Sequence, residues 1–181
     1  MTNPIDIISE FYKPGSKAYE ILVQHSEHVA QKALDAAAKV SHLNPDLKFI
    51  EEAAMLHDIG IFMTNAPGLG CTGQHPYICH GFLGRVILEK KGLPKHALVC
   101  ERHVGVGITV KDIKARHLPL PVYDMVPIST EEQIVCYADK FFSKNRDSVA
   151  SEKSVDDIKR ELEPFGQDKI TKFQSWRELF G

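Results

Sequence analysis

Apolar residues recur at the spacing of one helix face over residues 17–42 of this 181-residue chain. The face consists of Ile21, Leu22, His25, Val29, Ala33, Ala36, Ala37 and Val40. Ser16 follows the breaker Pro14-Gly15 and is suited to cap the first turn, because its hydroxyl can accept a hydrogen bond from a backbone N–H. The sequence therefore predicts a long helix from Lys17 to His42.

Similar spacing, interrupted by turn residues, predicts further helices downstream. They cover residues 46–57, 77–91, 94–103, about 109–117, a segment from 130, 154–163 and 167–179. Thr130 is the expected cap of its helix, with Gln133 in the capping-box position. Gly60 is expected to close the helix that ends near His57, as a residue that tolerates positive φ.

The Gly- and Pro-rich segment 61–76 breaks the helical pattern and is a candidate active-site loop, with a surface loop of no catalytic role as the alternative. We find no convincing strand pattern, so the predicted class is all-α. The length of 181 residues fits a single domain, 1–181. Its core is expected over about 17–145, with closing C-terminal helices over about 154–179.

Composition excludes several classes of partner. Hydrophobic residues make up 43% of the chain, and the net charge is -2, so there is no basic field for extended nucleic acid or an anionic membrane. No apolar run reaches the ~20 residues of a membrane span, and no signal peptide is recognised, so a cytoplasmic location is expected. The cysteines form no C-x-x-C pair and are expected to be reduced thiols; they are Cys71, Cys79, Cys100 and Cys136.

One polar pair, His57-Asp58, follows the apolar stretch 53–56. Burying such a pair is costly unless something binds it, and imidazole with carboxylate suits iron, manganese, zinc, nickel or cobalt. Neighbouring helical residues point about 100° apart. The pair can therefore share one metal only if the helix ends there.

Residues 25–30 read H-S-E-H-V-A, residues 57–60 read H-D-I-G and residues 137–140 read Y-A-D-K. In this order, the three segments resemble the H-S-x-x-V-A, H-D-I-G and Y-A-D-K motifs of the HD-domain superfamily of metal-dependent phosphohydrolases. The resemblance covers about residues 20–145 and implies a helical bundle with the metal site at its centre. The residues that it implies as ligands of one metal are His25, His57, Asp58 and Asp139.

Two further histidines extend the resemblance. His80 begins a segment similar to the H-x-x-x-G-x-x-I-L helix of HDIG proteins, and His103 ends the following helix. In members with the pattern H…HD…H…H…D, these histidines bind a second metal that the HD aspartate, here Asp58, bridges to the first. The resemblance therefore implies two divalent transition metal ions as cofactors.

The implied activity is hydrolysis of a small phosphorylated substrate, such as a nucleotide or related phosphoester, by a metal-activated water. Asp58 and His57 are the expected catalytic residues. Lys140, Arg102 and His28 are the expected substrate contacts. Lys140 and Arg102 are cationic donors, which pair strongly with phosphate oxygens. His28 lies three residues after His25 on a similar helix face, and a role as metal ligand in place of His25 is the alternative for it. Two further candidates for such contacts are Arg85 and Lys144.

One departure keeps other functions open. Many family members have a lysine directly after H-D-I-G that contacts the substrate phosphate, whereas this chain has Ile61. A di-iron oxygenase of the inositol oxygenase type would use the same ligand pattern, and a non-catalytic ligand-binding HD module is the third alternative. The sequence leaves a homodimer open.

Overall fold

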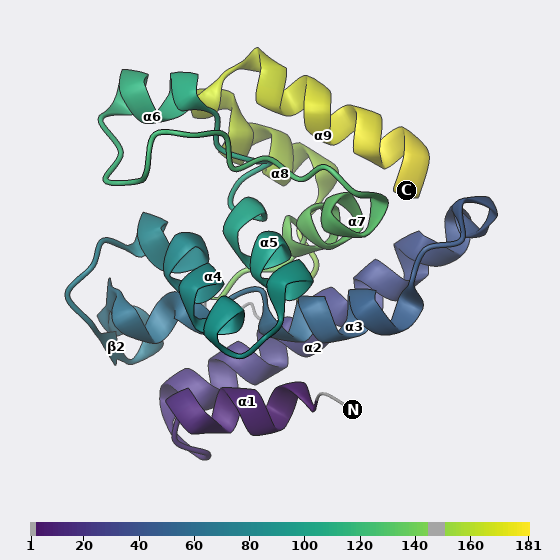
Figure 1. The fold of residues 1–181 in the computed structure, drawn as a ribbon. Helices are drawn as coiled ribbons and strands as arrows, with labels where there is room; N and C mark the ends of the chain where they lie inside the picture. The colour runs from purple at the N-terminus through teal and green to yellow at the C-terminus, as the bar shows by residue number, and fades with distance from the viewer. Residues whose placement is uncertain (1–2, 145–150) are drawn as a thin grey trace.

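The structure is a computed structural model that describes residues 3–144 and 151–181 (Figure 1). Its helices are α1 (Pro4–Phe11), α2 (Lys17–Lys39), α3 (Leu47–Leu56), α4 (His80–Lys90), α5 (Pro94–Arg102), α6 (Val110–Arg116), α7 (Thr130–Asp139), α8 (Val155–Leu162) and α9 (Gln167–Phe180). Short 3-10 turns are η1 (Ser41–Leu43), η2 (Ile59–Met63), η3 (Pro67–Leu69), η4 (Tyr77–Cys79) and η5 (Glu163–Phe165). Strands β1 (Asn65–Ala66) and β2 (Cys71–Thr72) pair antiparallel.

Helix α2 organises the bundle. It packs against α3 and α7, and the C-terminal helix α9 contacts both α2 and α7. Helices α8 and α9 lie at the opposite end of the molecule from α1 (Figure 1). In the main core between these helices, α2 contributes mostly alanine side chains. Helix α9 contributes the buried aromatic side chains Phe173, Trp176 and Phe180. Small residues on α2 let its neighbours approach closely, and the aromatic side chains fill the remaining space.

Helices α4 and α5 form a second tightly packed pair, and η2 packs against α4. Gly84 makes this possible, since a Cβ built there would lie 2.3 Å from Cys100 Sγ. Gly60 in η2 is equally close, since its Cβ would lie 2.2 Å from the carbonyl oxygen of His80. The two glycines therefore bring the segment after His57-Asp58 against the start of α4.

The all-α prediction is confirmed, and the predicted helices are present within a few residues of their expected ends. The long helix ends at Lys39 rather than His42, because a 3-10 turn follows and Asn44 adopts a left-handed conformation. The expected core limit at residue 145 lies outside the described residues. The prediction of no strands was wrong in one place, because β1 and β2, of two residues each, form a small hairpin within segment 61–76.

Three local features of the structure were not predicted or were predicted differently. Helix α1 was not predicted from the sequence, although Asn3 caps it. Ser129, not Thr130, caps α7, and its hydroxyl accepts from the backbone N–H of Glu132. Gly60 does not adopt positive φ. It is required for close approach to α4, which a sequence pattern cannot show.

Candidate metal centre

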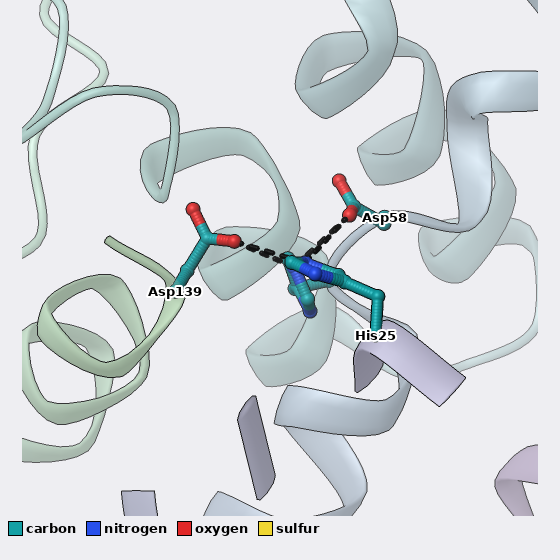
Figure 2. A group of neighbouring side chains, drawn as sticks. His25, Asp58 and Asp139 are labelled. Carbon is teal, nitrogen blue, oxygen red and sulfur yellow. Dashed lines mark hydrogen bonds and ion pairs between the residues drawn. The ribbon is translucent and has the colours of Figure 1, made fainter. Parts of the chain in front are cut away.

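Four buried side chains from three helices converge in the interior of the bundle. His25 lies on α2, His57 and Asp58 directly follow α3, and Asp139 is the last residue of α7. His25 Nε2 lies 3.0 Å from Asp139 Oδ1 and 3.4 Å from Asp58 Oδ2 (Figure 2). His57 Nε2 lies 3.1 Å from Asp58 Oδ2 and 3.4 Å from Asp139 Oδ1. Two imidazoles and two carboxylates thus face one point.

A second group meets the other oxygen of Asp58. His80 Nε2 and His103 Nε2 each lie 3.3 Å from Asp58 Oδ1, and 3.1 Å from each other. His80 begins α4 and His103 directly follows α5, so the close packing of these two helices brings the imidazoles together. Asp58 therefore belongs to both groups, with one oxygen facing each.

The end of α3 explains how neighbouring residues reach one site. His57 keeps helical dihedrals, whereas Asp58 leaves the helix with φ -106° and ψ 9°. The next turn, η2, is held by Tyr12 from the segment after α1. Its hydroxyl donates to the carbonyl of Ile59 and accepts from the N–H of Phe62, both at 2.9 Å. The backbone around Asp58 is thereby fixed from outside the motif.

Three of the histidines have a defined tautomer. Nδ1 of His57, His80 and His103 lies 2.6, 2.7 and 2.7 Å from the backbone carbonyl three residues earlier. A carbonyl only accepts, so each Nδ1 must donate its proton. In a neutral ring, Nε2 then carries a lone pair. The lone pairs of His80 and His103 would oppose each other at 3.1 Å unless a cation lay between them.

The charge states of the histidines agree with this need for a cation. Burial lowers the pKa of His25 and of His103 to about 4, so both imidazoles are neutral at pH 7. Burial also acts to lower the pKa of His57, but the charges of Asp58 and Asp139 outweigh it and raise the pKa to about 9. A proton or a metal ion on His57 Nε2 is therefore favoured, and metal binding would displace the proton.

Both carboxylates are ionised. Burial alone would raise the pKa of Asp58, but His57 and Lys144 hold it well below its usual range. Burial opposes ionisation of Asp139 as well, and Lys140 and Lys144 hold its pKa well below the usual range. Ionised carboxylates in a buried site require compensating positive charge.

The residues present fit divalent metal ions. Within the described residues, Asp58 Oδ1 is buried beside Nε2 of His80 and His103, which in neutral rings have no proton to donate, and an oxygen buried without a hydrogen bond is costly. The ligand atoms within each of the two groups, His25-His57-Asp58-Asp139 and Asp58-His80-His103, all lie within 4.8 Å of one another. Imidazole and carboxylate donors are those that first-row transition metals accept.

The candidate phosphate-binding cations have separate surroundings. Lys140 Nζ lies 3.0 Å from Asp139 Oδ2, the oxygen that faces away from the histidines. Lys144 Nζ lies 2.8 Å from Asp58 Oδ2 and 3.7 Å from Asp139 Oδ1, the oxygens that face inward. Lys144 is therefore the lysine that reaches the centre itself. The sequence favoured Lys140 because it directly follows Asp139, whereas Lys144 belongs to no periodic pattern.

The other predicted substrate contacts have protein partners in the structure. Arg102 forms an ion pair with Glu132 at 2.9 Å, and Arg85 pairs with Glu101 at 2.7 Å. The ring of His28 stacks on Phe142 with centroids 5.5 Å apart. None of these contacts is with the two groups of candidate ligands.

Residues 22–143 match the family model described as HD domain. A tRNA (cytidine(56)-2'-O)-methyltransferase of Picrophilus torridus is 35% identical over 133 residues, which are 73% of this chain but 34% of that protein. The protein of the same name in Thermoplasma volcanium is 32% identical over 75% of this chain and 35% of its own length. An uncharacterized protein of Methanocaldococcus jannaschii is 35% identical over 66% of this chain and 65% of its length.

The chain thus spans about a third of the two methyltransferases and about two thirds of the third relative. Among solved structures, the HD domain of the Listeria monocytogenes phosphodiesterase PgpH has the same fold, with a TM-score of 0.54, 14% identity and coverage of 97% of this chain and 95% of that one. The same domain in complex with cyclic-di-AMP gives a TM-score of 0.53. Within residues 3–144 and 151–181, no helix is both long and apolar enough to cross a membrane. With the family model covering most of its length, the chain belongs to the HD-domain family.

Proposed function

We propose that this chain is a metal-dependent phosphohydrolase that acts on a small phosphorylated substrate through two divalent transition metal ions. The observation that carries the proposal is the position of Asp58. Its Oδ2 faces His25 and His57, and its Oδ1 faces His80 and His103. A carboxylate between two imidazole pairs is suited to bridge two cations.

The roles of the chain's own residues follow from this arrangement. His25, His57, Asp58 and Asp139 would hold one ion, and Asp58 with His80 and His103 would hold the other. When bound, the ions would supply a water of lowered pKa and neutralise charge on phosphoryl oxygens. Asp58 would orient that water, because its two oxygens reach both groups. His57 is held in one orientation by the carbonyl of Ala54.

A small phosphoester is the proposed substrate class. The net charge of -2 provides no field for a long polyanion, so recognition has to come from a few local groups. Lys140 remains a proposed phosphate contact, because its ammonium lies 3.0 Å from Asp139 at the edge of the centre. Arg102 and His28 remain proposals too, and each would have to leave its present partner. PgpH binds cyclic-di-AMP, which makes a cyclic dinucleotide one member of the substrate panel.

Methyl transfer is not proposed for this chain. The two methyltransferases match over only about a third of their own length, so their name does not assign an activity to the matched segment. The residues gathered at the centre are of the types that divalent transition metal ions accept as ligands. They supply the groups needed for activation of water.

The experiment that tests the proposal combines metal analysis with a substrate panel. Protein purified without chelators is expected to hold up to two metal ions per chain, and the His80→Ala/His103→Ala double variant is expected to retain one. The wild type is then assayed for phosphate release from nucleotides and for cleavage of cyclic dinucleotides. A fully metallated wild type with a single ion would refute the two-metal site.

The same assay separates the alternative functions. Product formation that depends on dioxygen, without phosphate release, would favour the di-iron oxygenase. Tight binding of a phosphorylated ligand without turnover, at full metal content, would favour the ligand-binding module.

A further inference from the structure

Lys144 lies where the ligands of the first group converge. Its ammonium forms an ion pair with Asp58 Oδ2 at 2.8 Å and approaches Asp139 Oδ1 at 3.7 Å. These are the two oxygens that also face His25 and His57. The lysine thus contacts the atoms that a metal ion at this group would need.

The ammonium of Lys144 and a divalent ion would repel each other strongly if both lay against the same carboxylate oxygens. Charges a few ångströms apart interact by several kcal/mol even at the effective dielectric of a protein. A fully buried Asp58 cannot move to separate them, because Tyr12 and Gly60 fix the turn that follows it. Lys144 can move, because its side chain is 15% exposed and its four-carbon stem is flexible.

We propose that Lys144 is a resident counter-cation of the centre, which gives up Asp58 and Asp139 to an entering metal ion and then donates to a phosphoryl oxygen of the substrate. The first part concerns metal binding alone. The second part rests on the proposed function. Lys144 would thereby perform the phosphate contact that other family members are expected to make with the lysine after H-D-I-G, where this chain has Ile61.

Metal affinity tests the first part without any assay of activity. Lys144→Met keeps the stem and removes the charge, so Mn²⁺ should bind about tenfold more tightly, which corresponds to ~1.4 kcal/mol. Competition against a chromophoric chelator measures this affinity. Lys144→Arg keeps a cation and should stay within about threefold of the wild type. Lys153→Met is the matched control, because Lys153 pairs with Glu161 at 2.8 Å outside the centre. The affinity of this variant for Mn²⁺ should equal that of the wild type.

Binding of inorganic phosphate tests the second part without requiring turnover. Titration calorimetry of the fully Mn²⁺-loaded proteins should show about tenfold weaker phosphate binding in Lys144→Met, with no change in Lys153→Met. Circular dichroism checks that each variant is folded. If a phosphoester is turned over, its KM should rise in Lys144→Met by a similar factor.

Each outcome decides one part. The counter-cation role would be overturned if Lys144→Met bound Mn²⁺ no more tightly than the wild type, or if Lys144→Arg gained as much Mn²⁺ affinity as Lys144→Met. Unchanged phosphate affinity at full metal loading would overturn the phosphoryl contact. A wild type that binds Mn²⁺ and phosphate as expected but hydrolyses no phosphoester would refute the proposed function and leave the role of Lys144 in metal binding standing.

Discussion

Substitution of Gly60 by alanine tests whether close packing behind the HD motif builds the second half of the centre. An added Cβ would lie 2.2 Å from the carbonyl oxygen of His80 and 2.5 Å from the backbone nitrogen of Gly84. Both obstacles are backbone atoms, so no side-chain rotation relieves them. Since carbon contacts are optimal near 3.5–4.0 Å, the start of α4 has to shift by roughly 1 Å or more.

The cost follows from this overlap. Overpacking a core costs about 1–3 kcal/mol, and a clash with backbone belongs at the upper end, about 3 kcal/mol. For a chain of this size, each kcal/mol lowers Tm by about 2–4 °C, so Gly60→Ala should melt about 6–12 °C below the wild type. The shift also carries His80 away from Asp58, which lies 3.3 Å from it. The variant should therefore lose one metal ion in preference to the other.

Thermal unfolding followed by circular dichroism, with metal analysis of the same samples, measures both effects. Gly68→Ala is the control, because an added Cβ there meets nothing within 4 Å and φ is not positive. Its Tm should stay within about 2 °C of the wild type, since surface substitutions usually change stability by less than ~0.5 kcal/mol. A Gly60→Ala protein with wild-type Tm and metal content would show that the packing argument is wrong.

Three further predictions concern the centre, the turn beside it and the capped end of α6. Asp58→Ala should lose both metal ions, because Asp58 faces both ligand groups, and its kcat should fall by more than about a thousandfold. Its helical circular dichroism should be kept. A variant with the metal content of the wild type would contradict this prediction. Tyr12→Phe should lower the free energy of unfolding in urea by about 1–2 kcal/mol, since its hydroxyl makes two backbone hydrogen bonds, and an unchanged midpoint would count against that role. Burial opposes ionisation of Asp112, but Lys169 and Thr109 lower its pKa below 3.8, so the ionised carboxylate stabilises the fold above about pH 4 and this contribution is lost as pH falls further. In Asp112→Asn the free energy of unfolding should therefore fall less in acid than it does in the wild type. An identical dependence of that free energy on pH would contradict this prediction.

The sequence predicted most helices because their apolar faces repeat and their caps are local. Ser16 does cap α2, accepting from the backbone N–H of Tyr19. Helix α1 was missed because eight residues give too short a repeat, and its stability comes from contact with α3 and η2. Short helices of this kind depend on tertiary packing, which periodicity does not report.

The role of Gly60 and the position of Lys144 were not predictable for a different reason. Both depend on distances between segments far apart in sequence, from Gly60 to His80 and from Lys144 to Asp58. A glycine after a helix is usually taken as a C-terminal cap, and a lysine in a connecting segment is usually taken as a solvated charge. In each case the local pattern is the same whether or not a close neighbour exists.

The orientation of the histidines is a local property that the sequence does contain. His57, His80 and His103 each stand at the C-terminal end of a helical turn and hydrogen-bond through Nδ1 to the carbonyl three residues earlier. Unpaired carbonyls at helix ends favour such donors. Since Nδ1 is used in this way, Nε2 must face away from its own helix. Three independent helix ends therefore aim Nε2 away from their own helices before any metal binds, and packing around Asp58 has only to bring these atoms together.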